Sequence, residues 1–310
     1  MIKNKVNESL GEKNIMKEKL LYDMTDAENA IESLSKFLNI GKIELFSFIS
    51  IRADQDIIDY NKTYEELILE FDIDINELSI DNIEIKSIHV TTGDDNGYSI
   101  REKGLLNLQQ SLKQNTPLRK FLLKRDIRID VESNLIYFKD NKLVIVNDTS
   151  DYRGNKNYVY KKLYKDYGIN GFIYNNEPLK YEGNVANRPE FIYNISKMLK
   201  CSNLEKEWER ENKQCYTVEY KYPHEKLSWI NLALNREDKY EIEDNRKLYI
   251  KLWLIKQAIK VIIYDIMNFG KLEIISYLKL DENIPSQDII SIINTTKERN
   301  NLKLKRWNYF

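Results

Sequence analysis

The sequence predicts an α+β fold in which a split, mixed β-sheet core is flanked by helical regions at both ends of the chain. Helical periodicity dominates the two ends, whereas runs typical of strands are concentrated between residues 81 and 224. Helices and strands therefore fall in separate blocks and do not alternate, which argues against a parallel α/β sheet. The 310 residues are also enough for more than one substructure. We divide the chain into a helical region 1–80, a core 81–224 and a helical region 225–310.

The N-terminal region predicts three helices. Apolar residues recur three and four positions apart over 26–38, where Thr25 is the expected N-cap and Glu28 completes a capping box. Residues 43–51 form a second amphipathic run. Thr63 opens a third helix through the same type of box.

The central region contains most of the strand signals. Runs rich in β-branched and aromatic residues predict strands over 83–90, 135–138, 143–146, 171–174 and 216–222. Helical patterns between them predict helices over 99–112, 117–123 and 158–167, the last ended by Gly168. Residues 191–195 fit either a strand or the start of a helix.

The C-terminal region returns to helical periodicity. A long amphipathic pattern runs from residue 240 to Gly270, which is expected to end the helix. Ser286 is expected to cap a last helix over 288–294. The long helix carries so many apolar positions that a partner protein packed on the C-terminal helices would explain them.

The charge balance argues against a general attraction to polyanions. The chain has 48 Lys and Arg against 49 Asp and Glu, a net charge of −1, so nothing draws it as a whole to nucleic acid or an anionic membrane. The first residues are charged, which is unlike a secretory signal, and the apolar-rich run 255–266 is interrupted by charged residues. We therefore expect a cytoplasmic protein that does not enter the membrane.

Cysteine and histidine are too scarce to predict a metal centre. Cys201 and Cys215 lack the spacing of metal ligands, and the two histidines are far apart in the chain. Cys215 and His224 flank one predicted strand, so a Cys–His nucleophile stays open as an alternative.

His89 is the first candidate for chemistry. It lies at the end of a predicted strand and is followed by Val90, Thr91 and Thr92. Alternate residues of a strand share a face, so a threonine hydroxyl is expected close to whatever the imidazole binds. An imidazole and a hydroxyl together can hold a ribose diol.

Glu190 is the second candidate. It is followed directly by an apolar run, which would hold its carboxylate at the edge of the core. Such a carboxylate can stabilise a developing oxocarbenium ion or deprotonate a nucleophile. Arg188 beside it can bind phosphate or pair with Glu190. Glu219, within the predicted strand 216–222, is the alternative carboxylate.

Tyrosines form a third group of candidates. Tyr158, Tyr160 and Tyr164 share one predicted helix, and Tyr174 follows the Gly171 strand. An aromatic face can stack on nicotinamide or another flat heterocycle. The chain has 21 tyrosines, so ordinary packing is the competing interpretation for each of them.

These segments together resemble the ADP-ribosyltransferase superfamily, including its bacterial toxin-type members. The resemblance rests on His89-Val90-Thr91-Thr92, the helix with Ser99-Ile100 and Gly104-Leu105, Tyr160 and Tyr164, and Arg188-Pro189-Glu190-Phe191-Ile192. It covers about residues 83–222.

The resemblance implies a split β-sheet with an NAD pocket. His89 would contact the nicotinamide ribose, a tyrosine would stack on nicotinamide, and Glu190 would be the catalytic carboxylate. The expected activity is transfer of ADP-ribose from NAD to a protein or nucleic acid, as in a toxin or a phage-defence effector. Two alternatives remain: a non-enzymatic interaction protein, and a nucleic-acid-processing enzyme with a basic groove beside His89.

Overall fold

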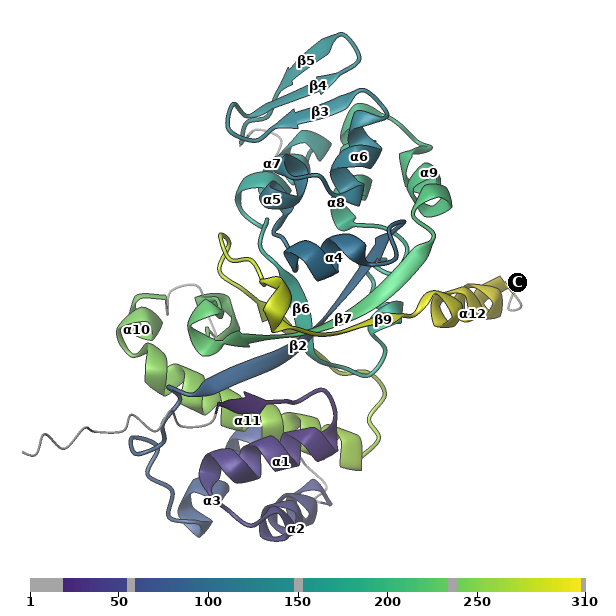
Figure 1. Ribbon diagram of the computed structural model, residues 1–310. Helices are drawn as coiled ribbons and strands as arrows, with labels where there is room; N and C mark the ends of the chain where they lie inside the picture. Colours follow the sequence, from purple (N-terminus) through teal and green to yellow (C-terminus); the bar gives the residue numbers. More distant parts are fainter. Residues whose placement is uncertain (1–18, 55–58, 148–152, 234–238, 308–310) are drawn as a thin grey trace, which may run out of the picture.

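The computed structural model describes residues 19–54, 59–147, 153–233 and 239–307, and it shows an α+β fold with a mixed main sheet (Figure 1). The sheet has six strands, and five of them follow the order β8-β6-β2-β7-β9. Their bounds are β8 Glu273–Tyr277, β6 Asn170–Asn175, β2 Ile83–Gly93, β7 Gln214–Pro223 and β9 Ile289–Asn294. The sixth strand, β1 (Leu20–Tyr22), pairs in parallel with the first residues of β2.

The β2–β7 ladder is the centre of the sheet. It runs without a break from Glu84 opposite Pro223 to Gly93 opposite Gln214. Because side chains alternate along a strand, the face that carries Ile85 also carries Ser87, His89 and Thr91. His89 was predicted at the end of a strand, but it lies inside the ladder opposite Val218, because β2 continues to Gly93.

Four helices, which we call the helical layer, cover this face of the sheet in the lower half of Figure 1. They are α1 (Ala27–Leu38), α2 (Lys42–Ala53), α3 (Tyr60–Glu70) and α11 (Arg246–Ile266). The apolar side chains of α11 pack against the other three helices and against the sheet. Most of the apolar positions that suggested a partner on the C-terminal helices are thus covered within the chain itself, although Leu248 and Ile266 are exposed.

A second group of elements, which we call the upper lobe, has its own core. It contains a three-stranded sheet of β3 (Ile127–Asp130), β4 (Leu135–Phe138) and β5 (Asn141–Val144). Its helices are α5 (Leu108–Lys113), α6 (Pro117–Leu123), α7 (Asn155–Tyr164), α8 (Glu190–Leu199) and α9 (Leu204–Glu211). Buried aromatic and aliphatic side chains, with Phe121 and Trp208 among them, fill the space between these elements.

The remaining elements connect these layers or extend from them. Short helix α4 (Tyr98–Lys103) follows β2, α10 (Lys239–Asp244) precedes α11, and α12 (Thr296–Trp307) projects from the end of β9 (Figure 1). Single 3-10 turns lie at Pro178–Lys180, His224–Lys226, Trp229–Asn231 and Ser286–Asp288.

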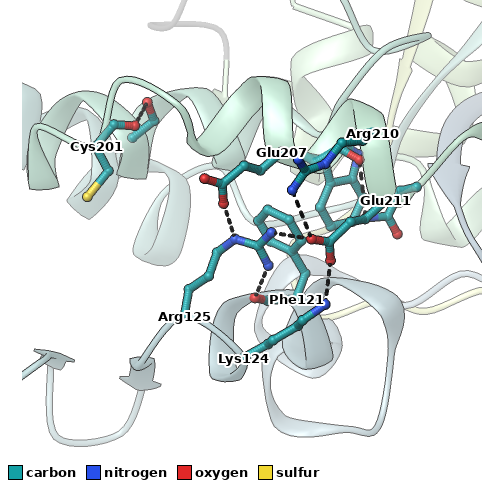
Figure 2. Close-up of polar contacts among 10 residues, drawn as sticks. Phe121, Lys124, Arg125, Cys201, Glu207, Arg210 and Glu211 are labelled. Atoms are coloured by element: carbon teal, nitrogen blue, oxygen red, sulfur yellow. Dashed lines mark hydrogen bonds and ion pairs between the residues drawn. The ribbon is translucent and has the colours of Figure 1, made fainter.

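Ion pairs join α9 to the end of α6 on the outside of the upper lobe. Figure 2 shows the Arg125 guanidinium between two carboxylates, 2.6 Å from Glu207 and 2.7 Å from Glu211. The same guanidinium lies 3.6 Å from the centre of the Phe121 ring. On the inner side of α9, Trp208 packs edge-on against Phe121 and donates a 2.9 Å hydrogen bond to Thr92 Oγ1 of β2. Helix α9 is thus fixed both to α6 and to the main sheet.

Several predicted elements are confirmed with shifted ends. The helix predicted over 26–38 forms, but its N-cap is Asp26, whose carboxylate accepts the backbone N–H of Asn29, and not Thr25. Thr63 lies inside α3, because Asp59 caps that helix. Two other predicted helices differ more from the structure. Helix α7 ends at Tyr164, before Gly168, and the single helix predicted over 240–270 is divided into α10 and α11.

Two predicted helices are wrong for reasons outside the local sequence. The helix expected over 99–112 breaks at Gly104, which has φ 74°, and where a Cβ atom would lie 1.8 Å from the Ile284 carbonyl oxygen. The helix expected over 288–294 is strand β9, which pairs with β7. Strands β1 and β8 were also missed, so the main sheet draws strands from all three predicted regions. None of the described helices has the length and apolar content needed to span a membrane.

Candidate functional site

A cavity of about 320 Å³ lies beside the second half of β2, where the main sheet meets the upper lobe. Its walls come from β2, from α4 and the residues after it, from the end of α7, from the start of β6 and from the start of α8. These segments are distant in sequence and meet only in the folded chain. Binding sites for small molecules commonly form in such concave junctions and have volumes of several hundred Å³.

His89 lines the cavity from β2. Its Nδ1 lies 2.8 Å from the backbone oxygen of Asn170 on β6. A carbonyl oxygen can only accept, so in the neutral ring Nδ1 carries the proton and Nε2 is left as an acceptor. Burial lowers the pKa of His89 more than the Asn170 hydrogen bond raises it, so the imidazole stays neutral near pH 7.

The two threonines after His89 differ in their roles. Thr91 shares the face of His89 and lines the cavity. Thr92 points to the other face, where its hydroxyl accepts the hydrogen bond from Trp208 Nε1. Thr92 also lines the cavity, but this bond occupies its hydroxyl, so Thr91 is the better placed of the two to contact a ligand.

Glu190 lines the same cavity as the first residue of α8. The sequence left residues 191–195 open between a strand and the start of a helix, and the structure has the helix. Lys162 of α7 lies 2.6 Å from Glu190 Oε2 and 2.5 Å from Asp166 Oδ2. Burial alone would disfavour a charged amine, but the two carboxylates outweigh it and raise the pKa of Lys162 above its usual value.

Aromatic side chains give the cavity its apolar surface. Tyr181 and Phe172 pack edge to face with ring centres 5.2 Å apart, and both line the cavity. Phe191, Trp208 and Tyr216 contribute to the lining from α8, α9 and β7. Flat apolar walls with a few polar groups suit a flat heterocycle that carries hydrogen-bonding substituents.

Three of the predicted binding residues lie away from this cavity. Tyr160 and Tyr164 pack against each other and against the core of the upper lobe, and Tyr164 donates its hydroxyl proton to the Val131 carbonyl at 2.9 Å. Arg188 is buried and pairs with Glu205. The side chains of these residues are therefore engaged within the protein, and they take no part in the site described here.

The alternative carboxylate and the alternative Cys–His pair lie outside the arrangement that their proposed roles require. Glu219 pairs with Lys86 and accepts from Ser291, and it does not line the cavity. Cys215 and His224 stand nine residues apart along β7 and its end, which at about 3.3 Å per residue separates them by roughly 30 Å, so they do not form a pair. Within the described part of the chain, no three Cys, His, Asp or Glu side chains come close enough to hold a metal ion.

The cavity is not a basic groove of the kind that a nucleic-acid enzyme would present. Its basic lining residues, Lys103 and Lys162, are matched by the acidic Asp95, Asp166 and Glu190. A lining with this balance offers no excess of positive charge for a phosphate backbone.

Sequence reasoning missed Lys162, Asp166 and Tyr181. The first two stand four residues apart in a helical pattern, a spacing that predicts an ion pair but not its place in a site. Tyr181 lies outside every helix and strand that the sequence predicts. The chain has 21 tyrosines, and no neighbouring residue marks this one as a site residue. Its position beside Phe172 depends on the fold.

Comparisons of the chain with protein-family models, with curated proteins and with solved structures found no match.

Proposed function

We propose that the cavity binds NAD and that the protein is an ADP-ribosyltransferase-like enzyme, which cleaves the nicotinamide–ribose bond and transfers ADP-ribose to a macromolecule. The observation that carries this proposal is the presence of His89 and the Glu190 carboxylate in the lining of one cavity. The two residues were singled out on separate sequence arguments, and the fold brings them into one site.

The chemistry assigns a role to each group. His89 Nε2 accepts a hydrogen bond from a ribose hydroxyl, and the Thr91 hydroxyl lies on the same face to assist it. The bond between the nicotinamide nitrogen and the ribose carbon breaks with its electron pair leaving on nicotinamide. Glu190 stabilises the positive charge that develops on the ribose, as carboxylates do in other glycosyl transfers.

Tyr181 takes the stacking role that the resemblance assigned to Tyr160 or Tyr164. It lines the cavity and is held by Phe172, whereas the other two tyrosines are packed in the upper lobe. The chain order of histidine, tyrosine and glutamate that the resemblance implies is preserved by His89, Tyr181 and Glu190.

The macromolecular acceptor completes the reaction. A nucleophilic atom of a protein or nucleic acid attacks the ribose carbon and loses its proton, and Glu190 or a water molecule takes that proton up. The cytoplasmic location expected from the sequence, and a role as a toxin or phage-defence effector, belong to this proposal.

Release of nicotinamide tests the proposal. The purified protein is incubated with NAD beside the Glu190→Gln variant and a matched Glu132→Gln control, whose side chain is 80% exposed and outside the cavity. We expect release by the wild type and the control, and a loss of about 10²-fold or more in Glu190→Gln. No release by the wild type with any macromolecular acceptor, or equal release by Glu190→Gln, would contradict the proposal.

A further inference from the structure

A continuous chain of polar contacts connects the two proposed functional residues. It starts at His89 Nδ1, 2.8 Å from the Asn170 backbone oxygen. The Asn170 side chain donates to Asp166 Oδ1 at 3.2 Å, and Asp166 Oδ2 lies 2.5 Å from Lys162 Nζ. Lys162 in turn lies 2.6 Å from Glu190 Oε2. All five residues line the cavity.

Lys162 is the most buried charged member of this chain. Its side chain is 18% exposed, against 44% for Asp166 and 49% for Glu190. A buried ammonium group between two carboxylates has little freedom to move, because leaving either partner would cost Coulomb energy in a poorly solvated place. Each carboxylate alone is exposed enough to turn toward solvent if that ammonium group were absent.

We propose, on the basis of the function proposed above, that Lys162 is a positioning residue: it holds the Glu190 carboxylate at the cavity wall and ties it through Asp166 and Asn170 to the backbone that holds His89. Lys162 does not itself react with NAD in this scheme. It fixes the distance between a group that binds the ribose and a group that stabilises the charge formed on it.

The kinetic test compares three variants. Lys162→Met keeps the length of the side chain and removes the charge, Lys162→Arg keeps the charge, and Lys165→Met removes an exposed charge at the end of the same helix, outside the cavity. We expect kcat for nicotinamide release to fall roughly 10- to 100-fold in Lys162→Met with little change in KM, because a misplaced catalytic group costs about that much. Lys162→Arg should recover part of the loss, and Lys165→Met should match the wild type.

A second measurement does not depend on turnover. The rate of acylation of individual lysines by an amine-reactive reagent is followed by mass spectrometry at fixed pH. Lys162 should react slowly in the wild type, since its carboxylate partners keep it protonated and part-buried. Glu190→Gln and Asp166→Asn should each raise its rate several-fold, while the rate of Lys165 stays the same.

The outcomes separate the two proposals. A wild type that releases no nicotinamide overturns the proposed function and the role of Lys162 with it, whatever the acylation rates are. A wild type that turns over while Lys162→Met has an unchanged kcat overturns only the role of Lys162. An acylation rate of Lys162 that ignores both carboxylate substitutions also overturns that role. If Lys162→Met fails to fold, Asp166→Asn replaces it, with the same expected fall in kcat.

Discussion

The helical layer and the upper lobe contact the same strand β2 through different kinds of interaction. The helical layer buries a continuous apolar core, in which Leu254, Ile255 and Ile259 of α11 are fully inaccessible to solvent. The upper lobe meets the sheet through a tryptophan–threonine hydrogen bond and an open cavity with charged walls. Apolar packing along the first half of β2 holds the strand in place, whereas the second half of the strand carries the polar groups that line the cavity.

Substitutions in the core of the helical layer should lower the free energy of unfolding the most. Leu67 and Leu69 belong to the same helix, but Leu67 is fully buried whereas Leu69 is 80% exposed. Leu67→Ala should lower the free energy of unfolding by about 2–5 kcal/mol, since it leaves a cavity in the core, and Leu69→Ala should change it by less than about 0.5 kcal/mol. Urea unfolding measures both, and similar losses in the two variants would refute the assignment of this core.

The contact between the upper lobe and β2 should contribute less to the free energy of unfolding than the core of the helical layer. Trp208→Phe keeps an aromatic ring but removes the hydrogen bond to Thr92, and Thr92→Val removes the same bond from the other side. Each change should cost about 1–3 kcal/mol. In a double-mutant cycle the two losses should not add, because one bond is lost in both cases. Fully additive losses would show that the bond does not contribute.

The ion pairs on the outside of α9 should contribute less to the free energy of unfolding than the Trp208–Thr92 hydrogen bond. Arg125→Met removes a guanidinium whose side chain is 14% exposed and which pairs with Glu207 and Glu211. We expect a loss of about 1 kcal/mol, reduced by high salt. Arg210→Met removes a 74% exposed partner at 3.9 Å from Glu211 and serves as the control, with no measurable loss expected. A larger effect for Arg210 would reverse this ranking.

Protonation of the two histidines should produce the smallest effect. Burial lowers the pKa values of both His89 and His224. The unfolded chain, with a histidine pKa of about 6.5, therefore binds protons more readily than the folded chain. Their contribution to stability is present above about pH 6.5 and is lost as the pH falls through the folded-state pKa values. The His89→Gln and His224→Gln variants should each lose less stability than the wild type between pH 7.5 and pH 5.5, as measured by urea midpoints. A steeper loss in either variant would contradict the sign of these shifts.

The parts of the fold that local patterns determine could be predicted. The apolar and β-branched run 83–90 was enough to predict strand β2. The strand continues to Gly93, however, so His89 lies inside the ladder opposite Val218 and not at the end of the strand. The run Ile289-Ile290-Ser291-Ile292-Ile293 was wrongly predicted as helix, because a short apolar run fits a helix or a strand and only its pairing with β7 decides. The same holds for the site: Glu190 could be named, but its partner Lys162 and the nearby Tyr181 come from other elements and meet it only in three dimensions.

Equilibrium binding of NAD tests the central claim most directly. Calorimetric titration of NAD into the wild type, His89→Ala and the control Leu69→Ala requires no acceptor and no turnover. We expect saturable binding by the wild type and the control, and an affinity lower by about tenfold, or ~1.4 kcal/mol, in His89→Ala. Absence of binding by the folded wild type, or an unchanged affinity in His89→Ala, would contradict the assignment of the cavity as an NAD site.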